Sequence, residues 1–446
     1  MYWLSTGVLF GVVAMSAVIV VLFVSGTRIV VQRMGGRNDA TTMAASGRPY
    51  TIPTASGAML RQFAWSIAIM GLLAVATAII LVRFTFGIGS VTNLENTFPW
   101  GLWIGFDVMS GVALAAGAFV IAGTAHILGM HRFEPLVKPA ILTGLLGYLL
   151  VIAGLVVDLG RPYNVWRPLV HWQHHSPLWE VGCCVAIYTT VLIIEFSPTM
   201  LKPVSEYEPV ASRLPVRSVL RFLTKFAIVF VILGVVLSTL HQSSLGSLWT
   251  LVPTKLHSLW YTVYLPVFFW ISAVAAGLAM TIVESTLSSK AFHRGLESHL
   301  LQDLGKAAAV VLAIYLVARS AELYARGDWV LLLQPTLPAV AYWMEIGLGI
   351  LTPILIFTIR PLRNRPWVLF TGAMMVVVFG IVLNRLNVSI VGLWDSSGVF
   401  YRPTWMEFAV SAALVTAGVL VFGLAAKYLP VFPPKEEESG AAGAAD

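Results

Sequence analysis

The residues most able to do chemistry in this sequence are acids and a histidine set within or beside apolar segments. Asp107 stands within the run 96–117, NTFPWGLWIGFDVMSGVALAAG, about two turns inside a predicted helix. Trp100, Trp103 and Asp107 have the spacing i, i+3, i+7, which places them on one face of an α-helix. A carboxyl group inside a membrane helix is costly, so Asp107 predicts a functional site. The alternative is a buried acid that pairs with a neighbour for packing.

Two other titratable groups predict a site at the same end of the helices. Glu180 opens an apolar segment and has few candidate partners nearby in the sequence, while His241 and Gln242 close a later segment. If successive segments alternate in direction, these residues and Asp107 all lie toward one membrane face. Polar groups gathered at one end of an apolar bundle indicate a binding site there.

Two pairs of opposite charge have structural explanations as well. Asp158 and Arg161 are three residues apart at a helix end, so they either pair with each other or belong to the site. Arg319 and Glu322 have the same spacing, and we interpret them as a structural pair.

The histidines and cysteines do not predict a metal or haem site. His171, His174 and His175 lack a supporting carboxylate or cysteine cluster, so we interpret them as part of an exposed loop. Cys183 and Cys184 are adjacent in an apolar segment and are interpreted as packing residues. A membrane b-type haem needs two facing histidines well inside helices, whereas every histidine here is predicted in a loop or near a helix end.

The composition defines the class of protein. Of 446 residues, 58% are hydrophobic and 11% are charged, whereas soluble domains carry about 25% charged residues. The chain is therefore predicted to be an all-α polytopic membrane protein. Hydropathy predicts eleven spans of bilayer length, at about 4–31, 63–82, 101–127, 139–157, 178–196, 220–240, 259–283, 304–323, 339–358, 367–388 and 406–428.

The loop charges predict the orientation in a bacterial inner membrane. Of the 28 Lys and Arg residues, 20 fall on the side that holds the odd-numbered loops and the C-terminus, and 8 fall on the other. The positive-inside rule places the N-terminus in the periplasm and the C-terminus in the cytoplasm. The net charge of +7 is explained by loops that face an anionic leaflet, so it does not indicate nucleic-acid binding.

Short repeats divide the predicted spans into two sets of four. VALAAGAFVI (112–121) resembles AVAAGLAMTI (273–282), and GVVLSTLHQSSLG (234–246) resembles GIVLNRLNVSIVG (380–392). Glu180 and Glu345 also occupy matching positions. The matches lie four spans apart, so both copies cross the membrane in the same direction. We predict an extra helix with a cytoplasmic linker at 1–62, a peripheral helix and outer loop at 63–100, parallel four-helix bundles at 101–258 and 259–402, and a peripheral helix with a disordered cytoplasmic tail at 403–446.

Several segments resemble the NrfD-like family of membrane subunits, and within it above all the membrane subunit of periplasmic nickel–iron uptake hydrogenases. The similarity covers about residues 65–434, so the helix at 4–31 and its linker are extra to the family pattern. The matching segments are FPWGLWIGFDVMSG (98–111), RFEPLVKPAILTGLLGY (132–148), VDLGRP (157–162), LWEVGCCVAIY (178–188), LHQSSLGSL (240–248), PTWMEF (403–408) and YLPVFPP (428–434).

The resemblance implies a subunit that reacts with a quinone, either menaquinone or ubiquinone, and holds no haem or iron–sulfur cluster of its own. A ferredoxin-like iron–sulfur subunit would dock on the periplasmic loops 158–177 and 241–258. It would carry electrons from a nickel–iron hydrogenase or, alternatively, from a molybdenum enzyme or multihaem cytochrome. The quinone site would lie at the outer end of the first bundle, lined by Asn96, Trp100, Trp103, Asp107, His241, Gln242 and Ser243.

The source of the protons for quinone reduction is left open by the sequence. Glu180 is predicted to relay protons, and a cytoplasmic route would add groups deeper in the membrane: Tyr148, Tyr188, His126, Glu195 and Glu284. Two other classes of function remain, namely a secondary transporter and a passive membrane anchor. The sequence does not decide the quinone, the catalytic partner, the direction of electron flow, proton pumping, the role of the extra helix or the oligomeric state.

Overall fold

The computed structural model describes residues 57–98, 100–207 and 215–433, with side chains from residue 64 onward. The described residues form helices and no strand, and the single β-bridge joins Glu95 to Phe98. The α-helices are α2 (Gly57–Phe86), α3 (Gly111–Leu114), α4 (Gly117–His126), α5 (Glu134–Asp158), α6 (Arg167–Val170), α7 (Pro177–Glu206), α9 (Val216–Lys225), α10 (Ala227–Thr250), α11 (Leu265–Ala291), α12 (Ser298–Ala325), α13 (Leu337–Ile346), α14 (Thr352–Thr358), α15 (Arg360–Arg363), α16 (Pro366–Met375), α17 (Leu383–Ser389), α18 (Trp394–Ser397) and α19 (Trp405–Tyr428). Three π-helical segments interrupt them, η3 (Trp103–Ser110), η7 (Gly347–Leu351) and η8 (Val376–Val382).

The predicted class of an all-α polytopic membrane protein is confirmed. Ten stretches of the described chain are long and apolar enough to cross a membrane, and they cover Ala64–Phe86, Trp103–His126, His131–Asp158, Pro177–Glu206, Ala227–Thr250, Leu265–Ala291, Ser298–Ala325, Leu337–Thr358, Pro366–Ser397 and Trp405–Tyr428. The predicted span at 4–31 and the tail after 433 lie outside the described residues. The linker predicted to reach residue 62 is too long, because α2 begins at Gly57.

Two helix boundaries differ from the prediction in a way that matters for the site. The predicted span 220–240 joins two elements, because α9 carries Arg217, Arg221 and Lys225 and ends at Lys225, while α10 runs on to Thr250. His241 therefore lies inside a helix rather than at its end, and the outer loop predicted to begin at residue 241 begins after Thr250. Likewise α11 extends to Ala291, which places Glu284 within the helix.

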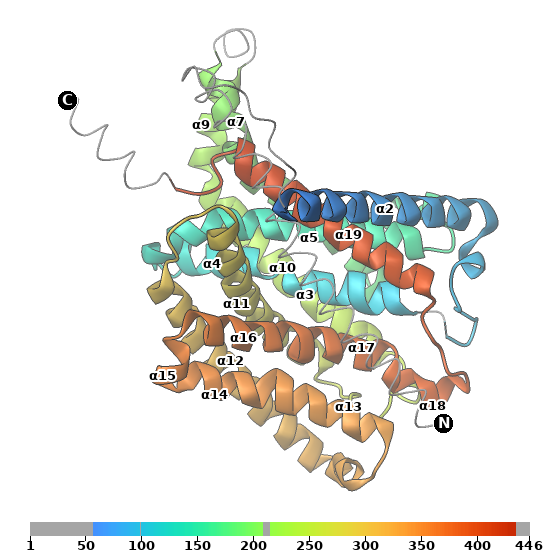
Figure 1. Cartoon of the computed structure of the whole chain (residues 1–446). Helices are drawn as coiled ribbons and strands as arrows, with labels where there is room; N and C mark the ends of the chain where they lie inside the picture. The colour runs from blue at the N-terminus through green and yellow to red at the C-terminus, as the bar shows by residue number, and fades with distance from the viewer. Residues whose placement is uncertain (1–56, 99, 208–214, 434–446) are drawn as a thin grey trace.

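The helices pack in two neighbourhoods that share a boundary. Helices α4, α5, α7 and α10 contact one another, and α11, α12, α14 and α16 form a second contacting set. Contacts of α11 with both α4 and α10 join the sets. Figure 1 shows α2 and α19 side by side on the outside of α5, in agreement with their contacts. Many contacts cross between the two neighbourhoods, so the packing does not divide the chain at the predicted domain boundaries. These boundaries stay a prediction.

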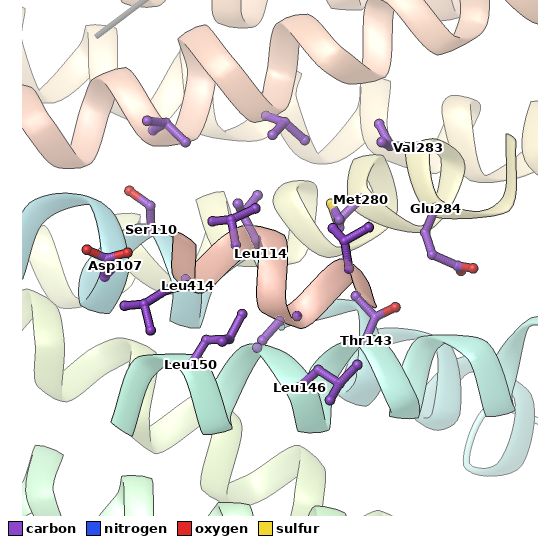
Figure 2. Close-up of a pocket in the computed structure, with 18 of the residues that line it drawn as sticks. Asp107, Ser110, Leu114, Thr143, Leu146, Leu150, Met280, Val283, Glu284 and Leu414 are labelled. Atoms are coloured by element: carbon purple, nitrogen blue, oxygen red, sulfur yellow. The ribbon is translucent and has the colours of Figure 1, made fainter. Parts of the chain in front are cut away.

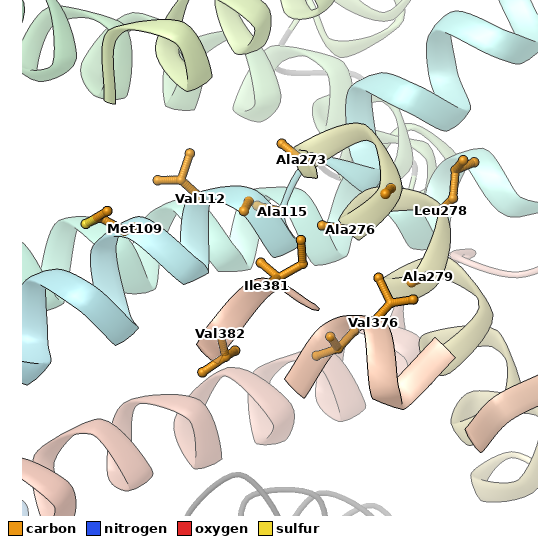
Figure 3. Packing of buried hydrophobic residues seen from close by; sticks show 14 of the residues in the cluster. Met109, Val112, Ala115, Ala273, Ala276, Leu278, Ala279, Val376, Ile381 and Val382 are labelled. Atoms are coloured by element: carbon orange, nitrogen blue, oxygen red, sulfur yellow. The ribbon is translucent and has the colours of Figure 1, made fainter. Parts of the chain in front are cut away.

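Small residues make the contact between the two neighbourhoods close. Ala115, Ala276 and Ala279 are buried where α3, α4 and α11 meet η8, and Figure 3 shows their side chains facing those of Val376 and Ile381. Small side chains let membrane helices approach until their backbones touch, and dispersion then stabilises the contact. This packing fixes the positions of η3 and α11, which carry two buried acids.

Candidate functional site

Asp107 is buried in the π-helical segment η3 and faces α19. Its side chain is 8% exposed, and the hydroxyl of Ser411 donates to its Oδ2 over 2.5 Å. Gly154 of α5 lies against the other side, because a Cβ at that position would fall 2.9 Å from the Cβ of Asp107. No ion pair of the described side chains involves this carboxyl group. Asp107 is thus a membrane-buried acid that bonds Ser411 and has no paired cation among the described side chains, and its functional role stays a prediction.

Trp100, Trp103 and Asp107 were expected on one helical face, but Trp100 lies apart from the other two. Trp103 donates from its indole to the carbonyl of Glu407 in α19 over 3.2 Å, so it faces the same helix as Asp107. Trp100 precedes η3 and packs edge-on against Trp249 of α10, with ring centroids 5.2 Å apart. The expected spacing does not apply to Trp100, because this residue precedes the first helical residue, Leu102. Residues 103–110, which include Trp103 and Asp107, are wound as a π-helix with i→i+5 bonds.

A cavity of about 220 Å³ begins at Asp107 and extends through the packed helices to Glu284. Asp107 and Ser110 lie at one end, and Thr143 and Glu284 lie at the other, as Figure 2 shows. The wall between these ends is hydrocarbon and includes Leu114, Leu146, Leu150, Val415, Val419 and Phe422. The arrangement is a partly open apolar slot with one buried carboxyl group at each end.

Glu284 is 3% exposed and accepts a hydrogen bond from Ser288 one turn further along α11, over 2.9 Å. An acid at a membrane interface would be solvated, whereas Glu284 is buried within α11. Its burial was not evident from the sequence, because the helix was expected to end at residue 283.

A second polar group fills the interior of the α5, α7 and α10 neighbourhood. The Tyr148 hydroxyl and His241 Nδ1 are 2.8 Å apart, and both side chains are fully buried. The ring of Tyr188 packs edge-on against Tyr148, with centroids 4.6 Å apart. The side chains of Tyr188 and Glu195 both lie against Gly234 of α10. Of the residues expected on a proton route, Tyr148 thus contacts His241, Tyr188 packs on Tyr148, and Glu195 lies next to Tyr188 at Gly234.

We name the row formed by Tyr148, Tyr188, Glu195, Ser238 and His241 the tyrosine–histidine file. Several of its polar atoms have no protein partner. Ser238 approaches both tyrosines, yet its hydroxyl, the Tyr188 hydroxyl and His241 Nε2 make no hydrogen bond with a described residue, and neither does Glu195 Oε1. Buried polar atoms without protein partners are costly unless water satisfies them. The role of the file as a proton route stays a prediction.

Asp107 and the file are separate sites along α5. Gly154, which touches Asp107, and Tyr148, which bonds His241, are six residues apart, or about 9 Å along the helix axis. Gln242 next to His241 turns to α3 and donates to the carbonyl of Val112 over 3.0 Å.

The remaining predicted site residues lie outside these two groups. Asn96 is exposed in the loop before η3, and Ser243 is half-buried in α10. His126 is exposed at the end of α4. Glu180 is half-buried in the first turn of α7, eight residues or about 12 Å along the axis from Tyr188.

Glu180 and Glu345, which match in the repeat, have different surroundings. Glu345 is fully buried and accepts hydrogen bonds from Trp260, Asn384 and Asn387, over 2.8 to 3.0 Å. Glu180 instead follows the helix cap formed by Ser176, where a negative charge is stabilised by the free N–H groups of the first turn.

The expected pair of Arg319 and Glu322 is wrong. Glu322 forms its ion pair with Arg326, over 2.6 Å, and Arg319 is buried and donates to the carbonyl of Leu259 over 2.5 Å. The (i, i+4) spacing of Glu322 and Arg326 places them on the exposed face, whereas Arg319 turns inward. Asp158 is buried with an unbonded Oδ1, and Arg161 is exposed.

The histidine loop is exposed, as expected: His171, His174 and His175 are all accessible. No group of His, Cys, Asp and Glu in the described residues could hold a metal ion. Cys183 and Cys184 are free thiols within α7, and the second is buried by packing.

The contribution of α19 was missed because this helix was expected to be peripheral. Ser411 bonds Asp107, and Glu407 is buried and accepts a hydrogen bond from the Tyr401 hydroxyl. Thr404 and Glu407 form a capping box that fixes the start of α19. The spacing Thr-x-x-Glu is the sequence signal that marks this helix start, but it carries no information about Asp107.

The fold and the two polar sites define a polytopic helical membrane protein with buried, unpaired acids at an apolar cavity. The model of the family described as "Polysulphide reductase, NrfD" matches residues 90–394. The chain belongs to this family.

Three relatives give the range of complexes in which similar chains occur. A protein of Nitratidesulfovibrio vulgaris is 40% identical over 82% of this chain and 92% of its own length. The "Probable Ni/Fe-hydrogenase 2 b-type cytochrome subunit" of Escherichia coli is 32% identical over 82% of this chain and 92% of its own. The "Menaquinone reductase, integral membrane subunit" of Nitratidesulfovibrio vulgaris is 32% identical over 79% of this chain and 87% of its own.

The haem that the name of the Escherichia coli relative implies does not fit the residues of this chain. All nine histidines are among the described residues, and only His241 is fully buried. A b-type haem held between membrane helices needs two facing histidines. The Nδ1 atom of His241 is moreover engaged by Tyr148.

Proposed function

We propose that this chain is the quinone-reactive membrane subunit of a multisubunit redox complex. The observation that carries the proposal is the apolar cavity with the buried, unpaired Asp107 at its predicted outer end. Family membership and the name of the menaquinone reductase relative support the same reading. The substrate is menaquinone or ubiquinone, whose ring oxygens need hydrogen-bond donors in an apolar pocket.

The proposed partners follow from two features of the described residues, which do not fit a haem and hold no metal-binding cluster. Electrons therefore enter from a ferredoxin-like iron–sulfur subunit on the periplasmic face. We propose a nickel–iron hydrogenase as the catalytic part, supported by the hydrogenase relative. A molybdenum enzyme or a multihaem cytochrome is the alternative partner.

Each polar site has a role in this proposal. Asp107 faces the quinone ring and, in its protonated form, donates a hydrogen bond to a ring oxygen, and Ser110 lies beside it with its hydroxyl donating to the Gly105 carbonyl. Quinone reduction adds two electrons and two protons, so a group that holds a proton must stand within reach of the ring. The tyrosine–histidine file supplies protons toward the ring, and His241 is its last titratable member.

The proton source is a finer part of the proposal. Glu195 begins the file on the predicted cytoplasmic half, so protons enter from that side and quinone reduction builds a gradient. Glu180 is half-buried near the predicted periplasmic surface and is the candidate for exchange on that side. His126 and Glu284 stay predictions as additional cytoplasmic groups.

The test is to purify the complex with Asp107→Asn and to compare electron transfer to menaquinone with transfer to a soluble dye. We expect quinone-linked turnover to fall at least about tenfold because a positioned proton donor is lost, while dye-linked turnover is unchanged. The control is Asp303→Asn, because Asp303 lies in an ion pair with Arg132 and Lys306 and does not line the cavity. If quinone-linked turnover is unchanged in Asp107→Asn, the function that remains is that of a passive membrane anchor. If the subunit purifies without redox subunits, a transporter is favoured.

A further inference from the structure

The cavity between Asp107 and Glu284 is lined mainly by apolar side chains, which do not suit a water path. A buried water needs two to four polar partners, and apolar cavities stay dry even at roughly 150 Å³. This cavity measures about 220 Å³ and offers polar groups only at its ends. The residues of α19 that line the cavity, from Leu414 to Phe422, are all apolar and span eight residues, or about 12 Å.

The polar and apolar contents of the interior are therefore segregated. Four unpartnered polar atoms, the hydroxyls of Tyr188 and Ser238, His241 Nε2 and Glu195 Oε1, belong to the tyrosine–histidine file on α7 and α10, whereas among the residues that line the cavity only Thr143 Oγ1, at the Glu284 end, is unpartnered. The cavity lies on the other side of α5, between η3, α11, η8 and α19. The file holds titratable groups that can carry protons, whereas the cavity is lined mainly by apolar side chains that suit a hydrocarbon chain.

We infer that the cavity holds the isoprenoid tail of the quinone, with the ring at Asp107 and Ser110 and the tail directed toward Glu284. This inference rests on the proposed quinone reactivity. Figure 2 shows Leu114, Leu146 and Leu150 lining the slot between the two acids, in the direction that such a tail would follow.

A phospholipid acyl chain is the competing occupant, and the charges of the site oppose it. No Lys or Arg lines the cavity, and its ionisable lining residues are the two acids Asp107 and Glu284. A phosphate headgroup drawn to this depth would be desolvated beside a carboxyl group without a cation. A quinone ring is neutral and presents only hydrogen-bond acceptors.

The test fills the cavity and varies the tail. Val419 lines the cavity and is 8% exposed, whereas Val421 on the same helix is 47% exposed and lines no part of the cavity. Val419→Phe in the whole complex should lower kcat/KM at least tenfold for a menaquinone with a long isoprenoid tail. It should change kcat/KM less than twofold for an analogue with one isoprene unit. Val421→Phe should change neither.

Two readouts keep the inference falsifiable if Val419→Phe perturbs folding. Dye-linked turnover and retention of the subunit in the complex report assembly, and Leu146→Phe fills the same cavity from α5. Mass spectrometry of the purified complex should find quinone in the wild type and less of it in Val419→Phe. Equal losses for both quinones, no loss for either, or a phospholipid that the substitution displaces would overturn the inference. A wild type that reduces neither quinone would instead overturn the proposed function.

Discussion

Gly117 of α4 and Gly277 of α11 lie back to back, and these two glycines occupy the same place in the two repeated segments. A Cβ on Gly277 would fall 2.7 Å from the backbone nitrogen of Gly117, and a Cβ on Gly117 would fall 3.2 Å from the Gly277 carbonyl oxygen. Each follows an Ala-Ala pair in the sequence. Equivalent positions of the two copies therefore meet where α4 crosses α11, and a side chain on either glycine would force the helices apart.

Gly277→Val should destabilise the subunit, because overpacking a close helix contact costs about 1–3 kcal/mol. We expect a lower midpoint of thermal unfolding and a lower yield of assembled complex. Gly71→Val is the matched control, since Gly71 is exposed in the membrane helix α2 and has no neighbour within 4 Å of its built Cβ. Equal stability of the two variants would contradict the close contact.

The outer loop between α5 and α7 should be the docking surface for the iron–sulfur subunit. Trp172, Tyr163 and Val170 are 74%, 70% and 62% exposed there. A photo-crosslinking residue in place of Trp172 should capture the iron–sulfur subunit. The control position is Trp367, which is 58% exposed in the first turn of α16 on the predicted cytoplasmic side. Crosslinks from Trp172 only to lipid would make these aromatic residues part of the interfacial belt instead.

Tyr148→Phe should separate proton delivery from electron delivery. The substitution removes the hydroxyl that bonds His241 and keeps the ring that packs on Tyr188. We expect quinone-linked turnover to fall about tenfold or more, with dye-linked turnover unchanged, because a link in a proton path is lost. Tyr315→Phe is the control, since Tyr315 is also a buried tyrosine but lies in α12, outside the file. Loss of both activities in Tyr148→Phe would indicate a folding or assembly defect.

Much of the fold could be predicted from the sequence, because each membrane span needs about twenty apolar residues and each loop carries its own charges. The boundaries of α10 and α11 could not, since hydropathy does not register where an amphipathic helix such as α9 gives way to a membrane helix. That error placed His241 and Glu284 at helix ends, whereas the structure places both residues within helices. Both residues were chosen for their chemistry, and their burial depended on tertiary packing.

The candidate site was predictable residue by residue but not in its grouping. Six residues could be chosen from residue type, their place in the predicted spans and the family resemblance: Asp107, Tyr148, Tyr188, His241, Glu195 and Glu284. Their division into a cavity and a polar file depends on which way each helix is turned. Ser411 illustrates the limit, because it bonds Asp107 across 304 positions of sequence and nothing local marks it. Trp100 likewise packs on Trp249 and does not join Trp103 and Asp107, because it precedes the first helical residue, Leu102, where the i, i+3, i+7 spacing does not apply.

The last prediction concerns the side from which protons reach the quinone, and α7 provides a matched pair of variants. Glu195 and Glu180 lie on one helix, fifteen residues or about 22 Å apart, with Glu195 on the predicted cytoplasmic half. Glu195→Gln and Glu180→Gln each remove one titrating proton and keep the shape of the side chain. If the file draws protons from the cytoplasm, Glu195→Gln in proteoliposomes should slow quinone-linked turnover and abolish proton uptake from that side. Glu180→Gln should then slow turnover less, because the file does not pass through it. The reverse order would place the entry on the periplasmic side at Glu180, and wild-type turnover in both variants would remove the two acids of α7 from the proton route.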